Sequence, residues 1–220
     1  LDEAHNIESV CLDSSSLRLN SKDLAGAIAD VEQVVTYCSS PAFDGNESPE
    51  DFLVLKGLLL QVENEIEKEI LLEPTKPASS QSTSTDPLNR SGNFIYTLLE
   101  RANIGASNQE RLLQLIKRAL EILEQNSTSL MRFGVSLLHL ETVFRALFVY
   151  RGSDQITKHF KLCLSTTKTV PPTRQLNYWC LWAGVAMQRM ASLRPRALLL
   201  TSGTLAPLDS FADQLAVPFP

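Results

Sequence analysis

The sequence lacks several features that would place it in a familiar class of protein. Its four cysteines (Cys11, Cys38, Cys163 and Cys180) lie far apart with no CxxC pair, so they give no support for a zinc or iron–sulfur site. No apolar run is long enough to cross a bilayer, and we expect no membrane partner. A formal net charge of −5 argues against a generally basic nucleic-acid surface. We therefore expect free thiols in a reducing compartment.

A phosphate-binding loop is missing as well. The pattern G-x-G-K-S/T, whose backbone and lysine hold nucleotide phosphates, does not occur in the 220 residues. The chain opens inside a motif without an initiator methionine and ends abruptly at Phe219-Pro220. We interpret the chain as a fragment, and we expect it to neither bind ATP tightly nor hydrolyse it alone.

Most of the interior has helical periodicity. Apolar side chains recur at helical spacing over 22–37, 49–72, 94–102, 107–125 and 130–150. Asn20 or Ser21 can cap the first of these helices, and Ser48 followed by Pro49 begins the second. We predict a mainly α-helical insertion over residues 20–165, with a disordered Ser/Thr/Pro-rich loop at 73–92.

Other segments have the pattern of strands. Residues 16–19, 160–164 and 176–180 alternate between apolar and polar side chains. The continuous apolar run 197–200 is typical of a strand buried on both faces of a parallel sheet. Short helices are predicted over 6–12, 184–193 and 207–215.

Two short motifs at the ends of the chain carry the chemistry. The first is Asp2-Glu3-Ala4-His5, preceded by Leu1, which we take as the end of a buried strand. Adjacent carboxylates can divide two tasks: Asp2 can hold the Mg²⁺ that bridges nucleotide phosphates, and Glu3 can orient and deprotonate the attacking water. His5 would sense the nucleotide state. The alternative for such a tetrapeptide is a helix N-terminus, where acids are favoured by the helix dipole.

The second motif follows the apolar run at 197–200. Ser202, Gly203 and Thr204 form a small, hydroxyl-bearing turn that could bond to a carboxylate across a sheet; most such tripeptides are only turns. Carboxyl ends of parallel strands form one edge, where ligands bind. We therefore expect residues 1–15 and 175–220 to share one parallel sheet, with Asp2 close to Ser202 and the helical body projecting away.

LDEAHNIE and LLLTSGTLAPLDSFADQL resemble motif II and motif III of the XPD-like superfamily 2 iron–sulfur DNA helicases. That family has a helical arch between these motifs, where the helical block falls here. TSGTLAP, the final PFP and LKGLLLQVENEI are most similar to the regulator-of-telomere-elongation branch. The resemblance covers the whole chain, but only its ends carry specific motifs.

The resemblance implies an α/β fold, a RecA-like (P-loop NTPase) parallel-sheet domain interrupted by the arch. Residues 1–19 and 166–220 would be its two parts. It implies ATP-dependent, 5′-to-3′ unwinding of DNA in repair, recombination and telomere maintenance, in the nucleus. ATP and Mg²⁺ would be bound by the complete protein. A 4Fe–4S cluster would lie outside this chain, with none of its cysteines as ligands. DNA single strands and duplex junctions are the implied partners, with repair or replication proteins at the arch.

Two alternatives remain open. A non-catalytic helical interaction module would have no need of the Asp2-Glu3 pair, and a metal-dependent nuclease would need further ligands that do not stand out. For the remaining residues we expect structural roles: His139 in a helix, His159 at a strand, Trp179 and Trp182 as packing, with base stacking as the minority alternative. The basic side chains Arg111, Lys117 and Arg118 would form a solvated face.

Overall fold

The computed structural model describes residues 2–41, 45, 47–72, 87–126, 134–204 and 208–216, and it is mainly helical. A short 3-10 helix, η1, spans Ala4–Asn6. The α-helices are α1 (Ile7–Ser15), α2 (Ser21–Cys38), α3 (Pro49–Leu71), α4 (Phe94–Arg101), α5 (Gln109–Asn126), α6 (Val135–Val149), α7 (Asp154–Thr157), α8 (Gly184–Ser192) and α9 (Leu208–Leu215). The strands are β1 (Leu17–Asn20), β2 (Leu88–Ser91), β3 (Phe160–Thr166) and β4 (Arg174–Cys180).

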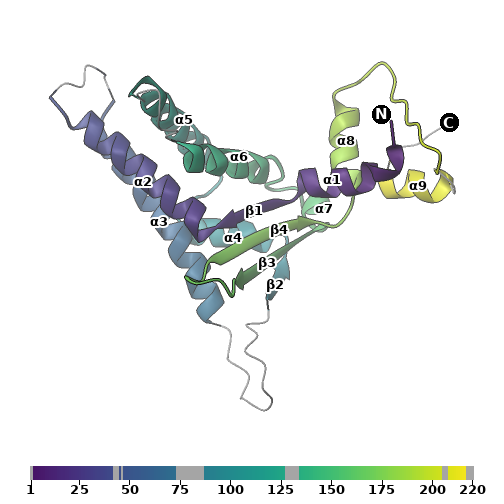
Figure 1. Cartoon of the computed structure of the whole chain (residues 1–220), viewed down its shortest axis with the longest axis horizontal. Helices are drawn as coiled ribbons and strands as arrows, with labels where there is room; N and C mark the ends of the chain where they lie inside the picture. Colours follow the sequence, from purple (N-terminus) through teal and green to yellow (C-terminus); the bar gives the residue numbers. More distant parts are fainter. Residues whose placement is uncertain are drawn as a thin grey trace, which may run out of the picture.

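The helical body predicted from periodicity is confirmed. Helices α2, α3, α5 and α6 pack around one apolar core and lie at the end of the molecule away from α1, α8 and α9 (Figure 1). Asn20 begins α2 with a capping box: its side chain accepts from the backbone N–H groups of Lys22 and Asp23. Helix α6 begins at Val135, and the earlier part of its predicted range, 130–133, lies outside the described residues.

The strands form a single four-stranded antiparallel sheet in the order β1-β4-β3-β2. Strands predicted near 16–19, 160–164 and 176–180 are confirmed as β1, β3 and β4. The prediction of a disordered loop over 73–92 is wrong for residues 88–91, because they form strand β2. Leu88 pairs with Leu164 of β3 and is buried, so its apolar side chain fixes this short strand on the core. Residues 73–86 of that predicted loop lie outside the described residues.

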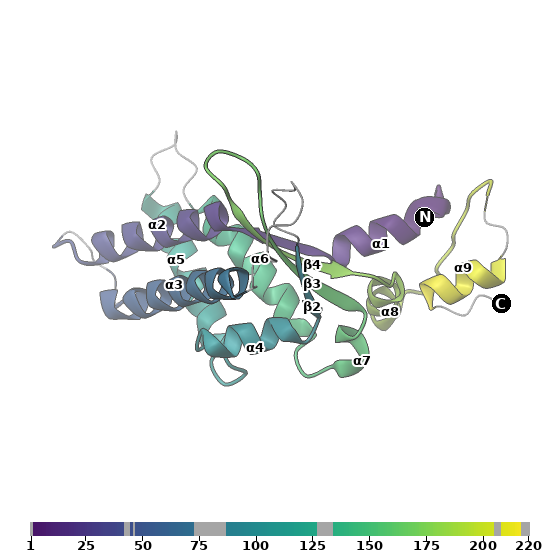
Figure 2. The same ribbon diagram turned by 90° about the horizontal axis from the view of Figure 1, so that it is seen from below.

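One face of the sheet is apolar and belongs to the main core. Its side chains include Phe160 and Tyr178, whose rings stack with centroids 4.6 Å apart. Helix α4 lies on this side of the strands in both views (Figures 1 and 2). The alternation of apolar and polar side chains in β3 and β4 therefore follows the two faces of the sheet.

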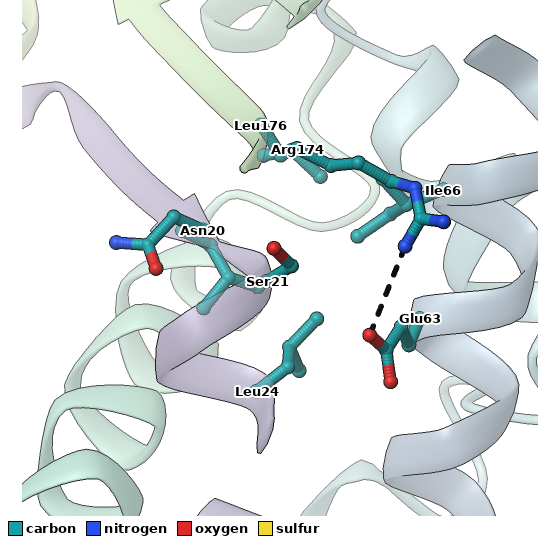
Figure 3. Close-up of a pocket in the computed structure, with 8 residues that line it drawn as sticks. Asn20, Ser21, Leu24, Glu63, Ile66, Arg174 and Leu176 are labelled. Atoms are coloured by element: carbon teal, nitrogen blue, oxygen red, sulfur yellow. Dashed lines mark ion pairs between the residues drawn. The ribbon is translucent and has the colours of Figure 1, made fainter. Parts of the chain in front are cut away.

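An ion-pair cluster ties the sheet to α3. Arg174 at the start of β4 contacts Glu67 and lies 4.0 Å from Glu63 (Figure 3). Arg174 and Glu63 lie at a recess whose lining is half apolar, with Leu24 and Leu176 among the apolar side chains. Its cavity volume of about 10 Å³ is far below the ~300 Å³ at which small-molecule sites usually begin. We interpret it as a packing feature and not as a ligand site.

The expected parallel sheet is not present among the described residues, where every strand pair is antiparallel. Residues 197–200 were predicted as a strand buried on both faces, and this is wrong for the described structure, in which they form no strand. Leu198 and Leu200 pack against a small core, whereas Leu199 is 74% exposed. A strand needs a backbone ladder partner, and no described segment pairs with this run.

The long segment between the two end motifs begins at β1 and ends at β4, which are neighbouring strands. Ser16, just before β1, accepts a 3.0 Å hydrogen bond at Oγ from the backbone N–H of Cys180, the last residue of β4. Beyond β4, the Trp182 ring packs on His159, with centroids 4.2 Å apart. These contacts join the sheet to helices α1 and α8.

Candidate functional site

The two end motifs meet in space. The backbone N–H of Ala4 donates a 2.9 Å hydrogen bond to the carbonyl of Thr201. The hydroxyl of Thr201 donates a second bond of 2.9 Å to Oδ1 of Asp2. The predicted proximity of the motifs is therefore confirmed, although it comes from these single contacts and not from a shared parallel sheet.

His5 connects the same two motifs through its side chain. Its Nδ1 lies 2.8 Å from Oγ of Ser202 and 3.1 Å from Oε2 of Glu3. A neutral imidazole can donate or accept at Nδ1, so the direction of the bond to Ser202 follows the tautomer. His5 thus contacts one carboxylate of the first motif and one hydroxyl of the second.

Glu3 has an unusual backbone conformation. Its φ of 52° and ψ of 44° lie in the left-handed region, which favours glycine, and it directly precedes η1. The Glu3 backbone N–H donates 3.0 Å to Oδ1 of Asp2. Left-handed non-glycine residues cluster at functional sites, where surrounding contacts hold them. Here, the bend points consecutive carboxylates to different partners: Asp2 to Thr201, and Glu3 to His5.

A small second core holds this arrangement. Helices α1, α8 and α9 contribute buried side chains to it, and the apolar run before Thr201 packs against it. Its buried members are Ile7, Cys11, Ala183, Met187 and Leu215. Burial of this cluster brings α1, which follows the first motif, beside the segments on both sides of the second.

The site is open, and its electrostatics favour ionised carboxylates. Asp2, Glu3, His5 and Thr201 are exposed, and Ser202 is half-buried. The hydrogen bond from the Thr201 hydroxyl lowers the pKa of Asp2 below its usual value, and the Glu3 backbone N–H adds to this effect. A carboxylate that is ionised, exposed and fixed by donors on one oxygen is a suitable ligand for Mg²⁺, which usually takes one or two carboxylates together with substrate phosphates. The residues present therefore fit such an ion.

The remaining predicted residues of the second motif are less engaged. Thr204 directs its backbone N–H to Oγ of Ser202 at 3.5 Å, within its own turn. In residues 2–41 and 134–204, no hydrogen bond joins Gly203 or Thr204 to Asp2, Glu3 or His5. Thr201, by contrast, was missing from the predicted site and makes the closest contact with Asp2. The signal was its hydroxyl, immediately after the apolar run.

The cysteines have no features of a metal centre. All four are buried free thiols, and burial raises the pKa of each. Within the described ranges, no group of three or more His, Cys, Asp or Glu side chains could hold a metal ion. The part of the chain that the structure describes contains no helix long and apolar enough to cross a membrane.

Several residues with predicted structural roles can be placed. His139 belongs to α6, and its Nε2 lies 3.1 Å from the carbonyl oxygen of Arg18. His159 packs on Trp182 as described above. Trp182 is half-buried, whereas Trp179 is 42% exposed. The predicted solvated basic face is paired with acids: Arg111 contacts Asp51, Lys117 contacts Glu121, and Arg118 contacts Glu47 and Glu121.

Comparison with known proteins places the helical and sheet body in a family. The family model described as RTEL1 helicase, ARCH domain matches residues 26–183. These residues include most of α2, all of α3 to α7 and the three strands β2, β3 and β4.

Curated relatives match over the whole chain. Three of them are named regulator of telomere elongation helicase 1 homolog: a protein of Oryza sativa subsp. japonica, 30% identical over 100% of the chain; one of Arabidopsis thaliana, 30% identical over 100%; and one of Drosophila willistoni, 28% identical over 99%. The chain spans 23%, 21% and 25% of their lengths, respectively. With this family model covering most of its length, the chain belongs to the RTEL1 helicase family, within the XPD-like helicases, and carries the family's ARCH domain.

Proposed function

We propose that the chain is part of an ATP-dependent DNA helicase and contributes one side of its ATP site. The observation that carries the proposal is the pair of side-chain contacts, Thr201 to Asp2 and Ser202 to His5, between motifs almost two hundred residues apart. A helical scaffold would not require a carboxylate and an imidazole of one motif to be held by hydroxyl groups from a distant segment. Membership of a helicase family and the names of the relatives support the same function.

The contacts of each side chain support the role proposed for it. Asp2, ionised and held by Thr201, would be the Mg²⁺ ligand. A bound Mg²⁺ would neutralise charge developing on the nucleotide phosphates. Glu3 would orient the attacking water and accept its proton. His5, between Glu3 and Ser202, would transmit the state of the site to the second motif, with Gly203 and Thr204 shaping the turn.

The wider assignment rests on the same family resemblance. We propose that residues 1–19 and 166–220 are two parts of a RecA-like domain, and that 20–165 form its arch. The complete protein would unwind DNA 5′-to-3′ in the nucleus, acting in repair, recombination and telomere maintenance. Its substrates would be single strands and duplex junctions, with repair or replication proteins as further partners. A 4Fe–4S cluster and the phosphate-binding loop would lie outside this chain.

The test compares the full-length protein with the chain alone. The full-length protein should hydrolyse ATP faster when single-stranded DNA is added and should separate a duplex bearing a 5′ single-stranded tail. The chain alone should give no heat of binding with Mg²⁺–ATP, because it lacks the loop and lysine that hold the phosphates. Micromolar binding by the chain alone would show that the site is misplaced. A full-length protein without ATP turnover would favour the non-catalytic interaction module.

A further inference from the structure

The outward face of the sheet carries polar and basic side chains and no acidic ones. Because side chains alternate along each strand, the register assigns Lys161, Trp179, Asn177 and Arg18 to the face opposite the apolar core. The full set of outward positions on the four strands is Arg18, Asn20, Asn89, Ser91, Lys161, Cys163, Ser165, Gln175, Asn177 and Trp179. None of them is Asp or Glu, although the chain has more acidic than basic residues.

An aromatic ring and a cation lie side by side on this face. Lys161 of β3 is the direct cross-strand partner of Trp179 of β4. Directly opposed side chains in antiparallel strands have Cβ atoms ~4.5–5.5 Å apart. Trp179 is 42% exposed and Lys161 is exposed. The ring is the largest apolar group on a face that is otherwise polar, and it lies at the end of the sheet nearest α1 and α8.

The basic side chains of this face are not neutralised by acids. In the described part of the chain, Lys161 and Arg18 have no carboxylate within ion-pair distance; Arg18 donates from Nε to Asn177 at 3.1 Å. Four arginines of the helices differ in this respect, because Arg101, Arg111, Arg118 and Arg145 each pair with a carboxylate, as does Arg174 at the start of β4. Positive charge on the sheet face is therefore available to a partner.

Among the described elements, α4 and α7 lie on the other face of the sheet. Helix α4 lies behind the strands in the view of Figure 1, and Figure 2 shows the sheet with α4 and α7 on one side. The buried leucines of the sheet face those helices. An exposed tryptophan with neighbouring cations and amides is the combination that binds single-stranded nucleic acid: the ring stacks on a base, and the cations contact phosphates.

We propose that the outward face of the sheet, centred on Trp179, Lys161 and Arg18, is a contact surface for single-stranded DNA. Trp179 stacks on an unpaired base, and Lys161 and Arg18 contact the backbone phosphates on either side. The exposed Asn89 offers hydrogen bonds, whereas Asn177 is buried and holds Arg18 through its Oδ1. The assignment rests on the proposed helicase function for the identity of the strand. It adds a binding surface on the antiparallel sheet, separate from the contacts between the two end motifs.

The test measures binding of the full-length protein to a labelled oligothymidylate strand by fluorescence anisotropy, without ATP. Trp179→Ala should raise Kd roughly 5- to 100-fold, as expected for loss of one base stack, and Trp179→Phe should retain most of the affinity. Lys161→Gln should lower the slope of log affinity against log salt by about 0.7, the value for one phosphate contact on a single strand. Binding to a blunt duplex should change less in Trp179→Ala, because its bases are already stacked.

Matched controls separate binding from folding. Leu53→Ala removes a comparably exposed apolar side chain from α3, and Lys117→Gln removes a charge from α5; both should bind as wild type. If the Trp179 and Lys161 variants had the same Kd and the same salt slope as wild type, the inference would be overturned. DNA-stimulated ATP hydrolysis by the wild type would in that case still uphold the proposed function. A wild-type protein that does not bind the strand would overturn both.

Discussion

The Thr201 hydroxyl donates a 2.9 Å hydrogen bond to Oδ1 of Asp2, 199 residues away in the sequence. The bond holds one oxygen of a side chain that is otherwise exposed to solvent. Removing the donor should therefore change the acid–base behaviour of Asp2 without removing the carboxylate itself.

For Thr201→Val, we expect the pKa of Asp2 to rise toward its usual value. In the native protein this pKa is lowered, so the hydrogen bond contributes above the ordinary pKa and is lost as pH falls through the lowered one. The acidic limb of kcat/KM for ATP should therefore move to higher pH in the variant. The measurement is a pH profile of the full-length protein, with Thr204→Val as the control. An unmoved limb would show that Asp2 does not set it.

Replacing Glu3 tests the catalytic role. Glu3→Gln keeps the shape of the side chain but cannot accept the proton of the attacking water, and such a loss typically lowers turnover ~10²- to 10⁴-fold. ATP binding should be retained, whereas Asp2→Asn should weaken Mg²⁺–ATP binding as well. Steady-state ATP hydrolysis with DNA present measures both. The matched control is Glu8→Gln on α1, and near-wild-type turnover in Glu3→Gln would remove the assignment.

His5 and Ser202 should act as a unit. Because their side chains are 2.8 Å apart, His5→Ala and Ser202→Ala should have non-additive effects on DNA-stimulated kcat/KM. The expected coupling is about 0.5–1.5 kcal/mol, the usual net contribution of a hydrogen bond. A double-mutant cycle measures it, and a second cycle of Ser202→Ala with Ser14→Ala should be additive. Additivity in the first cycle would mean that the contact has no part in catalysis.

Two helical glycines should respond to alanine with opposite signs. A Cβ at Gly26 in α2 would lie 2.3 Å from Oγ and 2.8 Å from Cβ of Ser136 in α6, whereas a Cβ at Gly57 in α3 would meet nothing within 4 Å. Gly26→Ala should destabilise α2 and α6 by about 1–3 kcal/mol through overpacking. Gly57→Ala should stabilise α3 by about 0.5–1 kcal/mol.

Hydrogen exchange of peptides from α2, α3 and α6 in the full-length protein reports these local changes. Adding Ser136→Gly to Gly26→Ala should restore part of the lost protection, because it removes the side chain that meets the new Cβ. Equal protection in Gly26→Ala and wild type would show that α2 and α6 separate at little cost.

The local features were predictable from sequence because their causes are local. The Asn20 capping box and the helical stripes depend on residues within a few positions of one another. Strand β2 was missed because its partner Leu164 is far along the chain, and nothing near Leu88 indicates that pairing. The run 197–200 was assigned to a strand from its apolar character alone, but a strand also requires a partner.

The candidate site was predicted in outline and not in detail. The carboxylates of Asp2 and Glu3, and their proximity to the second motif, followed from the motifs. The left-handed backbone of Glu3 and the bond from Thr201 did not, because they depend on how α1 and α8 pack. The pairing of Lys161 with Trp179 likewise required the register of β3 and β4.

The bond between Ser16 and Cys180 has a consequence for how this domain can vary. The segment that contains the helical body begins at β1 and returns at β4, and these strands are neighbours. Backbones of paired strands are only ~5 Å apart, so the whole segment between them closes on itself like a domain inserted into a surface loop. Helices and loops at its far end can therefore be lengthened, shortened or exchanged in evolution without changing the distance between Asp2 and Thr201.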